Sequence, residues 1–184
     1  NISDQQIIDI LLEQVKKNEQ IALGIDAPLT YQDGGGFRPQ DKAISAFLKS
    51  KALKVQSIMA PTMTKMVYLT LRGIALTKMI EAQTTLKSVK IIEVHPGSVL
   101  MTRLNPSQVP AFINYKKDKT IQIKVIDWLN HQHLTNLPKT LINSTHLTDA
   151  ALAALGTWHF FDTSLKPQWS FNEISILHPY PFCC

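Results

Sequence analysis

Residues 21–41 read IALGIDAPLTYQDGGGFRPQD, and the first part of this stretch decides the fold. Its opening residues, IALGI, are almost entirely apolar, which predicts a strand over residues 21–28 that ends at Pro28. A run without a polar face is typical of a parallel strand buried on both sides. Asp26 lies near the end of the run. A carboxylate at the edge of a core is costly unless it is paired, hydrogen-bonded or bound to a metal, so Asp26 requires a partner.

The rest of the chain alternates between helix and strand patterns. Ser3 and Gln6 have the spacing of a capping box, which predicts that a helix begins there and covers residues 3–18. Two more strands are predicted, over residues 89–96 and 169–182. Further helices are predicted over residues 38–53, 61–83, 110–134 (in two pieces) and 146–161. This order predicts an α/β fold with a small mixed sheet.

The length and composition are those of one globular domain over residues 1–184, with 45% hydrophobic and 18% charged residues. Three short strands are few for so many helices, and a strand buried on both sides needs neighbours on both sides. We therefore expect further strands before Asn1. A sheet edge left open by their loss can pair with another chain, so a homodimer is an open alternative.

No apolar run reaches the roughly 18 residues of a membrane span, and the polar start of the chain shows no signal peptide. Cys183 and Cys184 are adjacent and cannot link distant segments, so we expect a reducing, cytoplasmic location and no membrane partner. Lys and Arg outnumber Asp and Glu by 19 to 14, giving a net charge of +5. This charge permits nucleic acid as a partner without requiring it.

Three acids stand out by position: Asp26 and Glu93 near strand ends, and Asp149 near the start of a helix. Strand ends and helix starts can meet at one edge of an α/β sheet. Carboxylates brought together repel each other unless a cation lies between them, and oxygen ligands suit Mg²⁺ or Mn²⁺. Such ions support phosphodiester hydrolysis. The alternatives are a turn aspartate bonded to the backbone for Asp26, and a helix acid favoured by the dipole for Asp149.

Arg38 and Asp41 are three residues apart where the predicted helix begins. This spacing favours a local ion pair. The other interpretation places Arg38 at a phosphate, beside the free amides of the glycines at 34–36.

The histidines give weaker signals. His95 and His146 fall near the acids in sequence and are candidates for supporting roles. His178 with Cys183 and Cys184 could bind a soft metal, although we expect this segment to be a solvated tail. No cysteine pair has the spacing of a zinc finger.

Several short motifs occur in order along the chain. They are GIDAPL at 24–29, RPQD at 38–41, EVHPGSVL at 93–100, HLTDAALAAL at 146–155 and NEISILHP at 172–179. With these motifs the chain resembles, over about residues 3–180, the family catalogued as domain of unknown function 429. Members of that family are described as predicted nucleases with a ribonuclease H-like fold.

The resemblance implies a ribonuclease H-like mixed sheet flanked by helices, in which acids from two strands and the last core helix bind two divalent ions. By motif position, Asp26 is the acid of the fourth strand and Asp149 the acid of the last helix, which implies that both bind Mg²⁺ or Mn²⁺. Glu93 is implied as a further ligand or water-positioning acid, and Arg38 and Asp41 as further characteristic polar positions. The strand that carries the family's first acid would precede Asn1.

We therefore expect a divalent-metal-dependent nuclease or phosphodiesterase. Asp26, Glu93 and Asp149 would be its catalytic acids, and Arg38 and Asp41 would contact the substrate. The alternative is an inactive ribonuclease H-like module that binds a ligand or partner, with Asp26 and Arg38 in an internal ion-pair network. An ATP-using phosphotransferase is disfavoured, because the sequence has no glycine-rich phosphate loop of that type.

Overall fold

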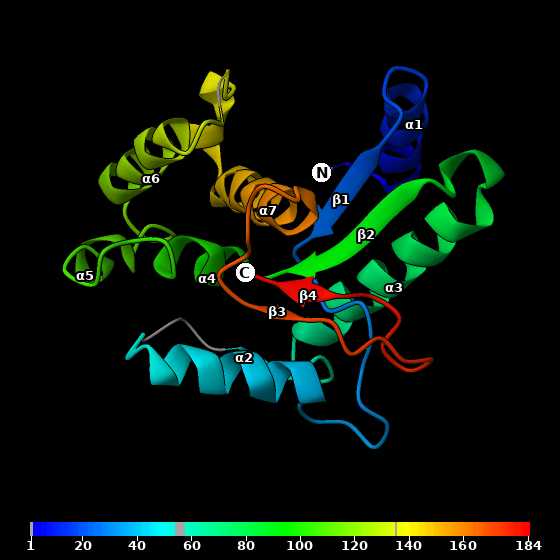
Figure 1. Ribbon diagram of the computed structural model, residues 1–184, viewed down its shortest axis with the longest axis horizontal. Coiled ribbons are helices and arrows are strands. Elements are labelled where there is room, and N and C mark those ends of the chain that lie inside the picture. Colours follow the sequence, from blue (N-terminus) through cyan, green and yellow to red (C-terminus); the bar gives the residue numbers. More distant parts are fainter. Residues whose placement is uncertain (1, 54–57, 135) are drawn as a thin grey trace.

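The structure is a computed structural model of the chain and describes residues 2–53, 58–134 and 136–184. It is an α/β structure with a mixed sheet and helices on both of its faces (Figure 1). The strands are β1 (Ile21–Ile25), β2 (Val89–Val94), β3 (Ser170–Phe171) and β4 (Phe182–Cys183). The helices are α1 (Asp4–Val15), α2 (Pro39–Ser50), α3 (Met66–Ala82), α4 (Pro96–Met101), α5 (Val109–Phe112), α6 (Lys119–His131) and α7 (Thr145–Phe161). Two short 3₁₀ helices are η1 (Thr84–Leu86) and η2 (Lys139–Asn143).

The sheet has the strand order β1-β2-β4-β3. β1 runs parallel to β2, with Ile21 opposite Val89 and Ile25 opposite Glu93. β2 also runs parallel to β4, whereas β3 is antiparallel to β4. Because β1 and β2 are parallel and in this register, both strands end at the same, carboxyl-terminal end of the sheet. Asp26, the residue after β1, therefore lies at the same end of the sheet as Glu93.

The prediction of neighbours on both sides of β1 is not met within the described ranges, where β1 pairs with β2 and forms the edge of the sheet. Its apolar character has another cause. One face of β1 packs against α1 and α3, and Gly24 on the other face packs against α7. Helices thus cover both faces in part, with Ile21, Leu23, Gly24 and Ile25 half-buried and Ala22 exposed. The existence of strands before Asn1 stays a prediction.

The last predicted strand, over residues 169–182, is wrong as a continuous element. The structure has β3 and β4 instead, joined by a segment in which Ile176 is 96% exposed. Pro179 and Pro181 in this segment lack the N–H groups that a continuous strand needs. A helix that the sequence did not predict, α4, begins at Pro96, which the sequence pattern indicates only as the end of a strand.

The predicted capping box of the first helix is confirmed. Ser3 Oγ accepts a hydrogen bond from the Gln6 backbone N–H at 3.2 Å, and Gln6 Oε1 accepts one from the Ser3 N–H at 2.8 Å. The helices predicted over 38–53, 61–83, 110–134 and 146–161 correspond to α2, α3, the α5–α6 pair and α7. None of the helices within the described ranges is long and apolar enough to cross a membrane.

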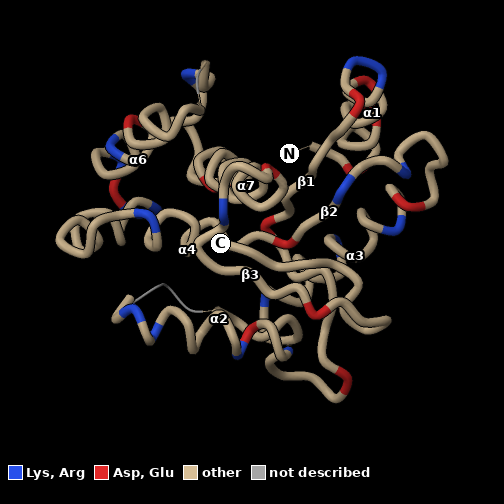
Figure 2. Tube along the Cα trace, in the orientation of Figure 1, with Lys and Arg blue, Asp and Glu red and all other residues tan. Residues whose placement is uncertain are grey.

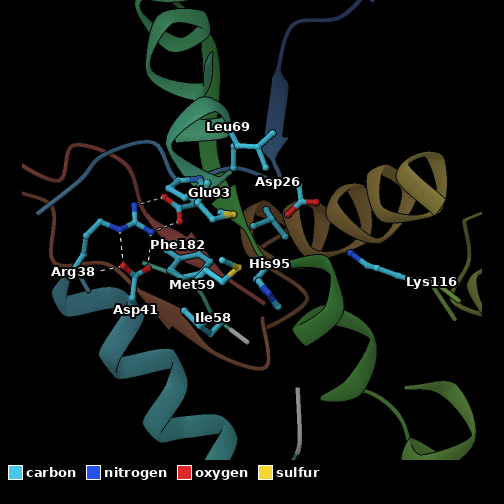
Figure 3. Close-up of a pocket in the computed structure, with 14 residues that line it drawn as sticks. Asp26, Arg38, Asp41, Ile58, Met59, Leu69, Glu93, His95, Lys116 and Phe182 are labelled. Atoms are coloured by element: carbon cyan, nitrogen blue, oxygen red, sulfur yellow. Dashed lines mark hydrogen bonds and ion pairs between the residues drawn. The ribbon is translucent and has the colours of Figure 1, made fainter. Parts of the chain in front are cut away.

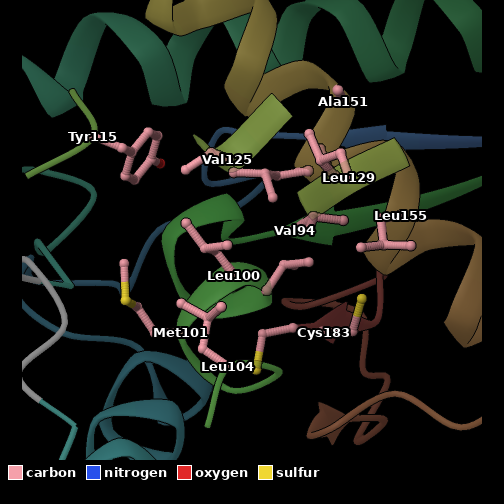
Figure 4. Packing of buried hydrophobic residues seen from close by; sticks show 14 of the residues in the cluster. Val94, Leu100, Met101, Leu104, Tyr115, Val125, Leu129, Ala151, Leu155 and Cys183 are labelled. Carbon is pink, nitrogen blue, oxygen red and sulfur yellow. The ribbon is translucent and has the colours of Figure 1, made fainter. Parts of the chain in front are cut away.

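Two hydrophobic cores lie on opposite faces of the sheet. The larger one joins β2 and β4 to α2, α4, α6 and α7 (Figure 4). The smaller one joins β1 and β2 to α1, α3 and η1. Successive residues of β2 alternate between them, since Ile92 and Val94 belong to the larger core while Ile91 packs against the smaller.

Close backbone packing fixes the chain around Asp26. A Cβ atom added at Gly24 would lie 1.9 Å from Thr157 Oγ1 of α7. A Cβ atom added at Gly73 of α3 would lie 2.9 Å from the Pro28 carbonyl oxygen. Glycine at these two positions lets α7 and α3 approach β1 and the following loop from opposite sides, so Asp26 is held at a defined place on the sheet edge.

Candidate functional site

A pocket of about 210 Å³ opens where β1 and β2 end (Figure 3). Asp26, Glu93 and His95 reach it from the sheet edge, and Arg38 and Asp41 reach it from the start of α2. The rest of its lining is Ala27, Pro28, Ile58, Met59, Met66, Leu69, Val94, Lys116 and Phe182. The structure thus brings four of the five predicted site residues to one pocket, and the fifth, Asp149, interacts with Asp26 from α7.

Arg38, Asp41 and Glu93 form a buried ion-pair group on one side of the pocket. The Arg38 side chain is only 1% exposed. Its Nη2 donates to Asp41 Oδ1 at 2.7 Å and to Glu93 Oε1 at 2.6 Å, while Nε donates to Asp41 Oδ2 at 3.0 Å. Nη1 donates to Glu93 Oε2 at 2.8 Å and to Thr30. All five guanidinium N–H groups therefore have partners within the protein.

Glu93 is held by this group and by the backbone. Its Oε2 also accepts the Leu29 N–H at 3.0 Å, so both carboxylate oxygens are occupied. Burial raises the pKa of Glu93, and the hydrogen bonds from Arg38 and Leu29 oppose that rise. The same carboxylate contributes to a raised pKa of Arg38, so we describe the two as a buried ion pair.

The predicted local pair of Arg38 and Asp41 is thus present, and it has a third member. The alternative in which Asp26 belongs to an ion-pair network with Arg38 is wrong about the acid. Glu93, and not Asp26, pairs with Arg38. Roles for Glu93 in metal binding and for Arg38 and Asp41 in substrate binding stay predictions. In this conformation the group connects β2, α2 and the segment around Thr30, which is a structural role.

Asp26 and Asp149 are the second pair of acids at the site. The pKa of Asp26 is raised to about 7, first because neighbouring atoms exclude water from its carboxyl group and second because the Asp149 charge lies nearby. Lys116 and Glu93 have smaller effects on this pKa, in opposite directions. The Asp26 residue as a whole is still accessible to solvent, so water moderates the shift. That Asp26 and Asp149 share a metal ion stays a prediction.

Asp149 is buried and bonded to two side chains of the segment before α6. Tyr115 donates its hydroxyl hydrogen to Asp149 Oδ1 at 2.5 Å. The Lys116 ammonium lies 2.6 Å from Asp149 Oδ2. Asp149 comes one turn after the N-cap Ser144 of α7, so these side-chain contacts replace the predicted alternative of a purely dipole-favoured helix acid.

Sequence reasoning missed Tyr115 and Lys116. They lie in the stretch NYKKDK, residues 114–119, which separates the two predicted pieces of helix. Nothing in this stretch distinguishes Lys116 from an ordinary solvated lysine such as its neighbour Lys117. Its contact with Asp149 depends on how α4 to α6 fold back over α7, which the local sequence does not specify.

His95 has a neutral imidazole at the pocket. It is the N-cap of α4, where its Nδ1 accepts the Ser98 N–H at 3.1 Å. An accepting Nδ1 places the single ring proton of the neutral form on Nε2. The pKa of His95 is lowered to about 4, first by burial and then by the nearby Lys116 charge. His95 therefore offers an uncharged N–H donor near neutral pH.

The other histidines lie elsewhere. His146 is exposed on α7, and neither pocket that contains Asp26 includes it. His178 Nδ1 bonds to Thr30 Oγ1 at 2.9 Å. The expected solvated tail is wrong for Cys183 and Cys184, because both are buried and burial raises the pKa of each thiol to about 12.

Asp26 and Asp149 are the side chains best suited to hold a metal ion. Within residues 2–53, 58–134 and 136–184 there is no group of three or more His, Cys, Asp or Glu side chains arranged for a metal. Mg²⁺ is nevertheless often held by one or two carboxylates, with water completing its octahedron. A pair of acids beside an open pocket fits that mode of binding, provided that Asp149 Oδ2 is released from Lys116.

The charged residues are distributed over many elements. Figure 2 shows Lys and Arg on α1, α2, α6 and the connecting segments, interspersed with Asp and Glu. With a net charge of +5, this distribution does not identify a nucleic-acid surface. Nucleic acid as a partner stays a prediction.

Comparison with known proteins adds no assignment. The chain matches no protein-family model, no curated protein and no solved structure. The resemblance to the domain of unknown function 429 family therefore stays a prediction based on the short motifs. Asp26, Asp149 and the side chains around them are the residues from which we infer a function.

Proposed function

We propose that the protein is a divalent-metal-dependent phosphodiesterase that acts on nucleic acids, built on a ribonuclease H-like fold. One observation carries the proposal. Asp26 lines an open pocket at the carboxyl end of a parallel strand pair, and Lys116, which lines the same pocket, contacts Asp149 of α7 at 2.6 Å. The charge of Asp149 also raises the pKa of Asp26. Acids in such a position are suited to bind Mg²⁺ or Mn²⁺.

The fold supports this proposal in its arrangement. β1 and β2 are parallel, helices cover both faces of the sheet, and α7 packs directly against β1. An acid that follows β1 and an acid near the start of α7 are the two positions that the resemblance implies as metal ligands. The sheet has four strands within the described ranges, and the ribonuclease H-like assignment is part of the proposal.

Each residue at the site would have a separate role in the reaction. A bound divalent ion supplies Lewis acidity and an activated water. Asp26 and Asp149 would hold that ion at the sheet edge. His95 would donate its Nε2 hydrogen to a non-bridging phosphate oxygen, since the neutral ring has a donor there. Arg38 would act as a positioning residue, because it anchors Glu93 and the loop that follows Asp26.

A second candidate function is binding without hydrolysis. It is favoured by the fact that both oxygens of Glu93, and both oxygens of Asp149, already have partners in the protein. On this alternative the pocket would hold a ligand, and the acids would stabilise the fold around it.

Cleavage assays separate the two functions. We expect the chain to cleave at least one member of a panel of single- and double-stranded DNA and RNA with Mg²⁺ or Mn²⁺, and none in EDTA. Asp26→Asn and Asp149→Asn should each lower the rate by at least about 100-fold, because each removes a metal ligand. Asp127→Asn, an exposed change on α6, is the matched control and should leave the rate unchanged. Full activity in both site variants would rule out the assigned ligands, and a panel left intact would favour the binding function.

A further inference from the structure

Lys116 is a partly exposed cation beside the two acids. Its ammonium lies 2.6 Å from Asp149 Oδ2, and the Lys116 side chain is 41% exposed while that of Asp149 is 6% exposed. Lys116, Asp26 and His95 line both the main pocket and a smaller one of about 60 Å³ beside it. In Figure 3 the Lys116 side chain extends toward Asp26, and the Arg38 group lies on the other side of Asp26. The ammonium therefore lies close to the place where a cation would bind both acids.

The electrostatics of the pair depend on this ammonium. Two nearby carboxylates repel each other, and a positive charge between or beside them relieves the repulsion. Arg38 is committed to Asp41 and Glu93, and within residues 2–53, 58–134 and 136–184 the cation paired with Asp149 is Lys116.

The attachment of Lys116 allows its side chain to move. Tyr115, the preceding residue, is buried at 3% exposure and holds the segment in place through its bond to Asp149. The Lys117 and Asp118 N–H groups both bond to the Asn114 carbonyl, which closes a turn around Lys116. The backbone is thus anchored, whereas the exposed lysine stem can turn toward water without disturbing the fold.

We propose that the Lys116 ammonium is a tethered cation that occupies the metal position on Asp149 in the metal-free protein, and that a divalent ion must displace it to bind. This inference rests on the proposed function, because it requires a metal site at Asp26 and Asp149. Lys116 then sets the concentration of Mg²⁺ or Mn²⁺ at which the site fills. It is a positioning residue for Asp149 when the ion is absent.

Titration of the metal-free protein with Mn²⁺ by isothermal calorimetry tests the inference without an activity assay. We expect Lys116→Met to bind Mn²⁺ about tenfold more tightly than the unchanged protein, because the ion no longer competes with a charged hydrogen-bond donor. Lys116→Arg keeps the charge and should bind within about threefold of the unchanged protein. Lys117→Met, the adjacent exposed lysine, is the matched control and should change the affinity by less than about twofold.

The outcomes distinguish this inference from the proposed function. Equal or weaker Mn²⁺ binding by Lys116→Met, with clear binding by the unchanged protein, overturns the inference alone. Absence of Mn²⁺ binding in both proteins overturns the metal site and the inference together. The inference is also overturned if Lys116→Arg binds Mn²⁺ as tightly as Lys116→Met does, since the positive charge would then be irrelevant. If Lys116→Met does not fold by circular dichroism, Lys116→Gln replaces it. Its amide can still donate a hydrogen bond to Asp149, which supports folding, and the expectation is the same because the amide carries no charge.

Discussion

Two acids at the ends of neighbouring parallel strands have different environments in this protein. Glu93 is enclosed by Arg38 and the Leu29 N–H, which satisfy both of its oxygens. Asp26 instead lies near a second carboxylate, Asp149, and beside an open pocket. The neighbours of each side chain therefore separate a structural acid from a candidate metal ligand, although both acids occupy equivalent places in the sequence pattern.

The raised pKa of Asp26 makes a prediction about stability and pH. Between its ordinary value of 3.8 and about 7, the folded protein keeps a proton on Asp26 that the unfolded chain has lost. The free energy of unfolding should therefore fall as the pH rises through this window, because the folded state binds more protons. Asp26→Asn should remove this contribution, which urea unfolding in EDTA at several pH values would measure. Asp127→Asn should keep the slope of the unchanged protein, and an identical slope in Asp26→Asn would refute the shift.

The buried group around Arg38 predicts a large loss of stability. Arg38→Met leaves Asp41 and Glu93 buried without a counter-charge, and should lower the free energy of unfolding by about 3–5 kcal/mol. Arg72→Met is the matched control, because Arg72 and its partner Asp4 are 37% and 30% exposed, and should cost less than about 1 kcal/mol. Denaturant unfolding of the two variants measures the difference. Equal small losses would show that the Arg38 group does not hold the fold.

Among the helices and strands, the contact of α7 with β1 positions the two acids relative to each other. Gly24→Ala should cost about 1–3 kcal/mol, because its new Cβ would lie 1.9 Å from Thr157 Oγ1. The double variant Gly24→Ala with Thr157→Ala removes the closest atom and should recover part of the loss, as a double-mutant cycle would show. Thermal unfolding of the four proteins in the cycle is the measurement. A stable Gly24→Ala protein would mean that α7 does not pack this closely.

Elements defined by local chemistry could be predicted from the sequence. The Ser3–Gln6 capping box set the start of α1, and apolar runs located β1 and β2. The chain after residue 169 could not be predicted, because apolar residues such as Ile176 suggested a strand although that residue lies in an exposed connection. The unpredicted helix α4 begins at a proline that fits either the end of a strand or the first turn of a helix.

The candidate site could be predicted only in part, for a related reason. Asp26 and Glu93 follow from the parallel pairing of two recognisable strands. Lys116 comes from a polar segment whose place beside Asp149 depends on the packing of several helices. Long-range contacts of this kind leave no periodic signal in the sequence, so the cation beside the acids is visible only in three dimensions.

For the protein considered as one unit, the sheet and its two cores support an open pocket at the carboxyl ends of β1 and β2, which Asp26 and Glu93 line. Helices on both faces hold that edge, and the Arg38 group secures it from the side of α2. The charged residues are spread over the elements, so the choice of substrate would depend on the pocket more than on a basic surface. We expect the metal affinity of the site to be modest, because Lys116 competes for Asp149.

A crystal structure of the protein with Mn²⁺, with anomalous data collected near the manganese edge, would decide whether Asp26 and Asp149 share a metal ion. We predict an anomalous peak within coordination distance of carboxylate oxygens of both residues, with water completing the coordination. The Lys116 ammonium should have left Asp149 Oδ2 in that structure. The peak should be lost in Asp26→Asn crystals treated in the same way. A saturated crystal without a peak between the two acids, or a peak of full height in Asp26→Asn, would show that they do not form a metal site.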